Sequence, residues 1–261
     1  MKNKKELGQH WLKNRVILEE IAEATKREYV EFCDNEWKDN EICVEIGPGL
    51  GTLTASLFRR FKKITAIEFD PDLARKLPGS FPGKELEVIN EDILRFDFLS
   101  IKEPYVVAGN IPYYITSPII EKLLKIEENR PRRIVLLIQK EVAERILDKK
   151  ETMLSLFVKN RARVLRGPIV KKEEFTPPPK VDSEVIILEP KEPEIGEEVF
   201  RLIKRGFISP RKKLAHNLGI EKEKILEIFG ELKIDENARP GDLGLGDWGR
   251  LHKKIQDELQ I

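Results

Sequence analysis

The 261-residue sequence has few cysteines, no long apolar run and almost no net charge, and each shortage excludes a class of protein. Cys33 and Cys43 are too few for a disulfide framework and have no histidine near them, so we expect no metal site and a reducing, cytoplasmic setting. The longest aliphatic run, Ile134–Ile138, is far shorter than the ~20 residues of a membrane helix. The charged segment Met1–Gly8 lacks the apolar stretch of a signal peptide, so neither export nor a membrane partner is predicted.

The remaining composition is that of a globular protein. Hydrophobic residues make up 40% and charged residues 36%, which excludes disorder and collagen-like repeats. The 47 Lys and Arg against 46 Asp and Glu leave a net charge of +1, which by itself gives no reason to expect a nucleic-acid partner. The length predicts one large domain, or one large and one small domain.

Short apolar runs alternate with helical patterns through about the first 190 residues. Strands are expected at 42–46, 64–67, 86–89, 106–108, 134–138 and 185–188, and helices at 50–61, 71–76, 117–125 and 141–148. Strands separated by helices are typical of a mostly parallel, doubly wound α/β sheet. After Pro190–Pro193 the pattern predicts helices alone, at 197–205, 210–218, 221–229 and 247–259. We therefore expect an α/β domain of residues 1–190 and a small all-helical domain of residues 191–261.

A glycine-rich turn follows the first expected strand. Gly47, Gly49 and Gly51 are spaced G-x-G-x-G, which differs from the G-x-G-x-x-G of dinucleotide-binding folds. Glycines allow the backbone to approach a ligand closely. Glu45 stands two positions before the first glycine and would repel a phosphate, so we expect a ligand of cationic rather than anionic character.

Carboxylates stand at the ends of the next two expected strands. Glu68 ends the second strand, where it can accept hydrogen bonds from both hydroxyls of a ribose. Asp92 follows the third strand and could accept a bond from an adenine amino group. Taken singly, the glycine-rich turn and each of the two carboxylates would more often have a structural role than a ligand-binding one, because glycine turns and solvated acids are common in loops. Taken in order at strand ends, where open α/β sheets bind ligands, they favour S-adenosylmethionine as the cofactor.

The fourth expected strand leads directly into Asn110, Ile111, Pro112 and Tyr113. These residues suit methylation of an exocyclic amine, a poor nucleophile because its lone pair is delocalised into the base. Two acceptors aimed at its hydrogens would favour a tetrahedral nitrogen. The Asn110 side-chain oxygen can be one acceptor, and the Ile111 carbonyl the other, because Pro112 restricts the residue before it. Tyr113 offers a face on which the base can stack.

A second aromatic residue would help to hold a flipped base, and Phe175 in the proline-rich segment 175–183 is the candidate. The plainer alternative is that Asn110 caps a turn, Tyr113 belongs to the core and the proline run is a rigid loop.

With these residues the chain resembles the ribosomal RNA adenine N6-dimethyltransferase family over nearly its whole length. The resemblance is carried by Leu7–Leu12, Gly47–Gly51, Glu68, Asp92, Asn110–Tyr113, Phe175–Ser183, Phe207–Leu218 and Arg239–Leu243. It implies a Rossmann-like class I methyltransferase sheet and dimethylation of two adjacent adenosines near the 3′ end of small-subunit rRNA. It also implies that the N-terminal segment folds over the cofactor, where Trp11 replaces the phenylalanine usual in the family. The implied cofactor contacts are His10, Leu12, Gly47, Glu68, Asp92 and Asn110.

Three other classes share parts of this pattern. A sister branch that methylates large-subunit rRNA has the same cofactor loop and Asn-Ile-Pro-Tyr motif, but the segment 207–218 resembles the small-subunit enzymes. Some non-catalytic nucleic-acid-binding factors are built on the same fold, and the intact motif residues argue against lost chemistry here. The adenine motif disfavours a general small-molecule methyltransferase.

Basic residues gather in two runs that contain no acid. Residues 159–172 include Lys159, Arg161, Arg163, Arg166, Lys171 and Lys172, and residues 201–216 include Arg201, Lys204, Arg205, Arg211, Lys212 and Lys213. One charged run is usually a solvated face, but two such runs predict a surface that follows RNA phosphates. Arg211, Lys212 and Lys213 are expected to bind the RNA backbone. The expected partner is small-subunit rRNA within a precursor subunit, bound by a monomer.

Overall fold

The computed structural model describes residues 9–26 and 42–259. Its contacts divide the chain into two compact units, one of residues 1–143 and 163–190 and the other of residues 144–162 and 191–261. One boundary between the two units follows Pro190. Residues 144–162, expected in the first domain, belong to the second unit, because Leu156 is buried in the core of that unit.

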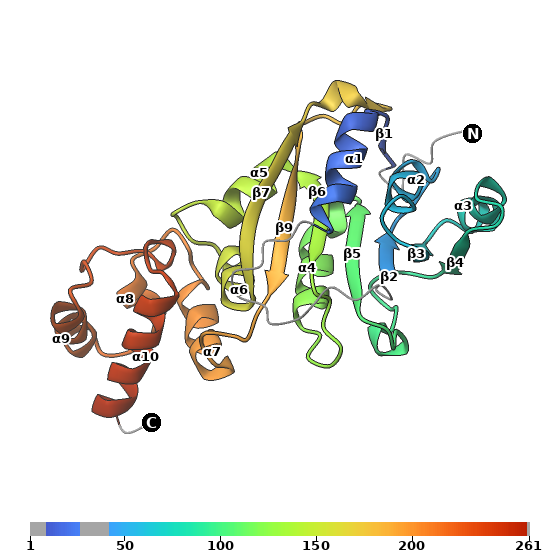
Figure 1. Cartoon of the computed structure of the whole chain (residues 1–261). Coiled ribbons are helices and arrows are strands. Elements are labelled where there is room, and N and C mark those ends of the chain that lie inside the picture. Colours follow the sequence, from blue (N-terminus) through green and yellow to red (C-terminus); the bar gives the residue numbers. More distant parts are fainter. Residues whose placement is uncertain (1–8, 27–41, 260–261) are drawn as a thin grey trace. The chain divides into compact units, whose positions relative to one another are not determined.

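A seven-stranded sheet forms the first unit, in the strand order β4-β3-β2-β5-β6-β9-β7 (Figure 1). The strands are β2 (Ile42–Ile46), β3 (Lys63–Glu68), β4 (Glu85–Asn90), β5 (Tyr105–Asn110), β6 (Ile134–Gln139), β7 (Ala162–Val170) and β9 (Ser183–Pro190). Neighbours from β4 to β6 pair in parallel, and β9 pairs antiparallel with β6. The expectation of a mostly parallel α/β sheet is confirmed. The sequence analysis did not predict β7, nor the two-residue strands β1 (Trp11–Leu12) and β8 (Phe175–Thr176).

Helices cover both faces of this sheet, as the continuous apolar strands predict. They are α1 (Arg15–Ala24), α2 (Thr52–Leu57), α3 (Pro71–Lys76), α4 (Thr116–Leu124) and α5 (Lys140–Leu147). On one face, Leu18 and Ile21 of α1 and Leu57 of α2 share a buried cluster with side chains of the central strands. The alternate strand residues, such as Val107 and Leu136, are equally buried on the opposite face, where Figure 1 shows α4. The sheet therefore has a buried, mainly apolar core on each side.

The second unit is helical. It contains α6 (Met153–Arg161), α7 (Glu197–Gly206), α8 (Leu214–Asn217), α9 (Lys222–Leu232) and α10 (Leu245–Leu259). Its core surrounds Trp248, which is fully buried against α7 at Gly206. A Cβ atom at Gly206 would lie 2.4 Å from the indole ring, so the helix approaches the tryptophan more closely than an alanine would permit. Helix α8 begins at Leu214 rather than at the expected Pro210, because residues 210–213 form a turn.

Within residues 9–26 and 42–259, no helix is long and apolar enough to cross a membrane. The same residues contain no group of three His, Cys, Asp or Glu side chains that could hold a metal ion. Cys43 is buried in β2, and Cys33 lies outside the described residues.

Candidate active site

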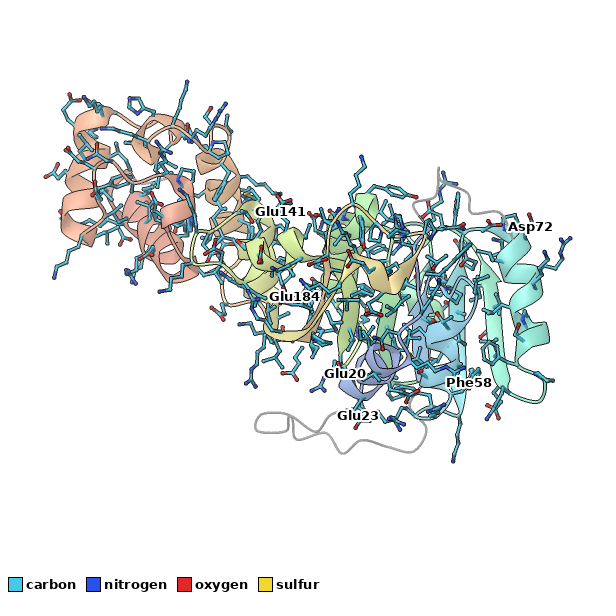
Figure 2. The ribbon with its side chains drawn as sticks, turned by 90° about the horizontal axis from the view of Figure 1, so that it is seen from above. Glu20, Glu23, Phe58, Asp72, Glu141 and Glu184 are labelled. Carbon is cyan, nitrogen blue, oxygen red and sulfur yellow. The ribbon has the colours of Figure 1, made fainter. Side chains whose placement is uncertain are left out.

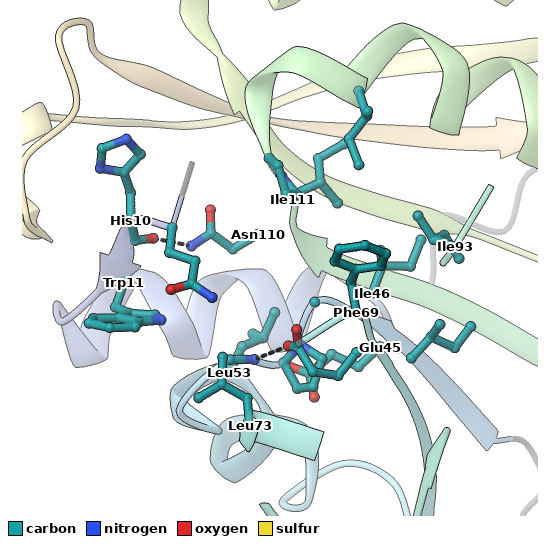
Figure 3. Close-up of a pocket in the computed structure, with 18 of the residues that line it drawn as sticks. His10, Trp11, Glu45, Ile46, Leu53, Phe69, Leu73, Ile93, Asn110 and Ile111 are labelled. Atoms are coloured by element: carbon teal, nitrogen blue, oxygen red, sulfur yellow. Dashed lines mark hydrogen bonds between the residues drawn. The ribbon is translucent and has the colours of Figure 1, made fainter. Parts of the chain in front are cut away.

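A pocket opens at the carboxyl ends of β2, β3, β4 and β5, the edge at which open α/β sheets bind ligands (Figure 3). The predicted residues that line it are His10, Leu12, Gly47, Glu68, Asp92, Asn110, Pro112 and Tyr113. The structure thus brings together every cofactor and catalytic residue expected from the sequence. Leu7 and Gly8 of the N-terminal motif lie outside the described residues.

The glycine turn after β2 has a backbone that other residues rarely adopt. Gly47, Gly49 and Gly51 have φ values of 65°, 58° and 80°, all in the left-handed region. At Gly49 a Cβ atom would also lie 3.1 Å from Nε1 of Trp11, which packs on the turn from the N-terminal segment. The turn therefore needs glycine both for its conformation and for the close approach of Trp11.

Glu68 is held at the end of β3 by backbone donors. Its carboxylate accepts hydrogen bonds from the N–H of Gly49 at 3.0 Å and from the N–H of Asp70 at 2.8 Å. Asn90, at the end of β4, donates to the Glu68 carbonyl at 2.8 Å. Burial raises the pKa of Glu68, and the two backbone bonds oppose that shift. Each oxygen still has a lone pair with which it can accept a ligand hydroxyl.

Glu45 corrects the charge argument drawn from the sequence. Its side chain is buried, and the hydroxyl of Thr54 donates to it at 2.6 Å. Burial raises the pKa of Glu45 to about 8. The carboxyl is therefore mostly protonated at neutral pH, so the expectation that its charge repels phosphate is wrong. The group lines the pocket as a neutral acid.

Asp92 lies in a turn that a helix residue supports. Its carboxylate accepts the N–H of Leu94 at 2.9 Å, and Lys122 of α4 donates to the Leu94 carbonyl at 2.9 Å. Burial lowers the pKa of Lys122, while the nearby Glu91 and Asp92 oppose that shift. Sequence reasoning missed Lys122, because nothing in its helical pattern relates it to a turn near residue 94.

The side-chain amide of Asn110 is hydrogen-bonded through its nitrogen, while its oxygen accepts no hydrogen bond from the described residues. Its nitrogen donates to the backbone carbonyl of His10 at 2.8 Å, as the dashed line in Figure 3 shows. The side-chain oxygen is then available to accept a hydrogen bond within the pocket. Nearby, the Pro112 carbonyl accepts the N–H of Ile115 at 3.3 Å, whereas no described group of the chain donates to the Ile111 carbonyl. Two acceptors thus lie in consecutive residues at the end of β5, the side-chain oxygen of Asn110 and the carbonyl of Ile111.

Tyr113 is fixed on one side. Its hydroxyl forms a 2.7 Å hydrogen bond with the hydroxyl of Ser183, and its ring stacks on the His10 imidazole with centroids 5.9 Å apart. Burial raises the pKa of Tyr113. The phenol therefore stays neutral at physiological pH, with His10 stacked on one face of its ring.

The N-terminal segment is tied to the proline-rich segment beside the pocket. Strand β1 pairs antiparallel with β8, which places Leu12 opposite Phe175. The Pro177 carbonyl accepts a hydrogen bond from Nδ1 of His10 at 2.8 Å. Through His10, this segment positions both Asn110 and Tyr113.

The proposed stacking role of Phe175 is not supported. The side chain is 2% exposed and packs with Leu12 and Leu18 in the core beneath α1. It does not line the pocket, so it offers no face to a base in this structure. Two aromatic residues that the sequence analysis did not select do line the pocket: Phe69 is 59% exposed and Tyr114 is 63% exposed. Phe69 directly follows Glu68 and Tyr114 directly follows Tyr113, and this adjacency to predicted site residues is the sequence feature that could have indicated them.

The first basic run is largely neutralised by acids distant in the sequence. Arg166 forms an ion pair at 3.0 Å with Glu184, which is labelled on β9 in Figure 2. The other pairs are Lys159 with Glu151, Arg161 with Glu197, Arg163 with Glu189 and Lys171 with Asp182. Five of the six cations of this run thus have an acidic partner within the protein, which the sequence pattern did not indicate.

The second basic run differs from the first. All six of its Lys and Arg side chains are exposed, and none forms an ion pair with a described acid. They are Arg201, Lys204 and Arg205 on α7, and Arg211, Lys212 and Lys213 in the turn before α8. We refer to these six residues as the basic surface of the second unit.

A family model described as ribosomal RNA adenine dimethylase matches residues 1–257 of the chain. A ribosomal RNA small subunit methyltransferase A from Thermosynechococcus vestitus is 35% identical over 98% of each chain. The chain belongs to the ribosomal RNA adenine dimethylase family. Another small subunit methyltransferase A, from Mesomycoplasma hyopneumoniae, is 37% identical over 95% of this chain and 94% of its own.

Solved structures resemble this dimethylase in fold. A dimethyladenosine transferase from Plasmodium falciparum superposes with a TM-score of 0.77 at 28% identity, covering 95% of this chain and 98% of its own. The 23S rRNA methyltransferase ErmE superposes with a TM-score of 0.75 at 24% identity, and the match covers 94% of this chain and 99% of its own. This similarity shows that the two chains share a fold. The expected class I methyltransferase architecture is confirmed.

As a member of this family the protein is a methyltransferase, and the family implies S-adenosylmethionine as the methyl donor. The pocket suits that molecule. At Gly49 the lining is backbone without a side chain, and Glu68 and Asp92 add carboxylate oxygens that can accept hydrogen bonds from hydroxyl and amino groups. Because Glu45 is mostly neutral, the pocket carries less negative charge than the sequence indicates.

Proposed function

We propose that this dimethylase transfers methyl groups to N6 of two adjacent adenosines near the 3′ end of small-subunit rRNA, within a precursor subunit. The observation that carries the proposal is the Asn110 amide, whose nitrogen is bound by the His10 carbonyl so that its oxygen faces a prospective amine. The names of the full-length relatives support the small subunit as the source of the RNA. We further propose that it acts as a monomer in the cytoplasm.

The reaction needs an amine that behaves as a nucleophile. We propose that the Asn110 oxygen and the Ile111 carbonyl accept hydrogen bonds from the N6–H groups, two in the first transfer and one in the second, which favours a tetrahedral nitrogen with its lone pair directed at the methyl donor. In each transfer the new N–C bond replaces the bond between sulfur and the methyl carbon, and the nitrogen then releases one proton to solvent. Tyr113 stacks on the adenine with its free face and holds it out of the RNA helix. Pro112 restricts Ile111 to an extended conformation, which directs its carbonyl.

S-adenosylmethionine, when bound, supplies an electrophilic methyl group on sulfur. We propose that Glu68 accepts the ribose hydroxyls with the lone pairs that its two backbone donors leave free. Asp92 then accepts the adenine amino group of the cofactor, and Gly47 allows close approach of the backbone. His10 and Leu12 line the same pocket from the N-terminal segment and exclude water from the cofactor.

The chemistry is tested with labelled S-adenosylmethionine and unmethylated small ribosomal subunits, followed by nucleoside analysis of the rRNA. We expect N6-dimethyladenosine in small-subunit RNA from the native protein and none from Asn110→Ala. An Asn110→Ala variant that keeps full activity would overturn the mechanism. Methylation found only in large-subunit RNA would overturn the substrate assignment.

The basic surface of the second unit is proposed to bind RNA phosphates. Its six cations are exposed and unpaired among the described residues, so their charge is available to a polyanion. The double variant Lys212→Glu with Lys213→Glu should weaken RNA binding and reduce the slope of log K against log salt by roughly 1 for each lost phosphate contact.

A matched control is Lys222→Glu with Lys224→Glu, which makes the same change of net charge on α9 of the same unit, outside the basic surface. We expect the control to keep most of the affinity and the salt slope. If both double variants lower the RNA affinity and the salt slope equally, RNA binding depends on the net charge of the protein and not on this surface.

A further inference from the structure

Tyr114 is an exposed aromatic side chain on the wall of the proposed adenosine site. It is 63% exposed, and it lines the same pocket as Asn110 and Tyr113. Within the described part of the chain, its ring stacks on no other ring and its hydroxyl forms no hydrogen bond. Packing and hydrogen bonding within the protein therefore do not account for a large aromatic residue at this position.

The neighbouring Tyr113 can serve only one base. The His10 imidazole covers one face of its ring, and its hydroxyl is bound to Ser183. Tyr113 and Tyr114 begin a short 3₁₀ helix, Tyr113–Ile115, in which successive side chains diverge by about 120° because there are 3 residues per turn. The two side chains therefore leave the backbone in different directions, and Tyr114 offers a second stacking surface at the pocket.

We propose that Tyr114 stacks on the nucleotide next to the flipped adenosine and so favours RNA in which that nucleotide is a purine. This inference rests on the proposed function, in which the substrate carries two adjacent adenosines. When one of the two adenosines occupies the pocket, the other is its neighbour on one side and is a purine, the larger of the two base types and the one that covers more of a phenol ring. Consecutive tyrosines would thus hold consecutive nucleotides.

The test is a double-mutant cycle on small subunits reconstituted with altered RNA. Loss of one base–aromatic stack should raise the KM for subunits by about 5- to 150-fold in Tyr114→Ala, whereas Tyr114→Phe keeps the ring and should retain the native KM. Replacing one of the two adenosines by an abasic nucleotide should raise the KM of the native protein by a similar factor. It should have little further effect on Tyr114→Ala, because the partner of the stack is already absent.

Leu99→Ala serves as the control, since Leu99 is a 49% exposed side chain that does not line the pocket, and its KM should not change. Additive losses in the cycle, or an unchanged KM in Tyr114→Ala, would overturn the role of Tyr114. In that case Asn110-dependent methylation of intact subunits would continue. Failure of the native protein to methylate intact small subunits would instead overturn the proposed function.

Discussion

Buried Glu45 should make the stability of the protein depend on pH, and Glu45→Gln isolates that dependence. Burial raises the pKa of Glu45 from 4.5 to about 8, so between these values the folded protein holds a proton that the unfolded chain releases. The free energy of unfolding therefore falls as pH rises through this window. At about 1.4 kcal/mol per pH unit, the stabilising contribution amounts to roughly 5 kcal/mol, present below pH 4.5 and lost by about pH 8.

Glutamine cannot ionise, has nearly the same size and can still accept the Thr54 hydroxyl through its amide oxygen. Urea denaturation of both proteins, followed by circular dichroism from about pH 5 to about pH 8.5, measures the difference in free energy of unfolding. Groups common to both proteins cancel in that difference. Between the two ends of this pH range, the free energy of unfolding of Glu45→Gln should rise by about 4 kcal/mol relative to that of the native protein. A difference that stays constant would refute the reasoning from burial.

Three further substitutions have defined outcomes. Gly49→Ala places a side chain at a φ of 58° and a methyl group 3.1 Å from Trp11. The substitution should lower the free energy of unfolding by about 1–2 kcal/mol and weaken the binding of S-adenosylmethionine. An unchanged affinity in calorimetric titration would contradict this. Lys122→Met removes the donor to the Leu94 carbonyl that supports the turn after β4. The KM for S-adenosylmethionine should therefore rise while kcat stays nearly constant. A fall in kcat by the same factor as the rise in KM would argue against a positioning role. Gly206→Ala forces a methyl against Trp248 and should destabilise the second unit by about 1–3 kcal/mol, measured by tryptophan fluorescence, with cofactor binding retained.

Central strands could be predicted from the sequence because they are buried on both faces. Residues 134–138 are a continuous apolar run and residues 42–46 are apolar except for Glu45, and the structure has strands over Ile42–Ile46 and Ile134–Gln139. Strand β7 escaped prediction because it is the last strand of the sheet. An edge strand tolerates the exposed Arg163 and Arg166 and a proline, which break up its apolar pattern.

Residues of the pocket could be predicted where short motifs follow strands, as at Glu68 and Asn110. The sequence could not show which side chains the fold would bury. Phe175 lies in a loop-like segment, yet strand pairing with Leu12 draws it into the core. The charge of Glu45 and the availability of Arg166 likewise depend on burial and on partners distant along the chain.

The contact between His10 and the proline-rich segment has a consequence for the order in which the protein is made. The oxygen proposed to receive the amine is oriented by His10, and His10 is bound by Pro177, 167 residues further along the chain. A nascent chain that has just completed β6 already contains Asn110 and the parallel strands, but not the residue that fixes His10. The contact between His10 and Pro177 can therefore close only after residue 177 has been made. A chain that ends before this residue carries the amide of Asn110 without the contact that holds His10 in place.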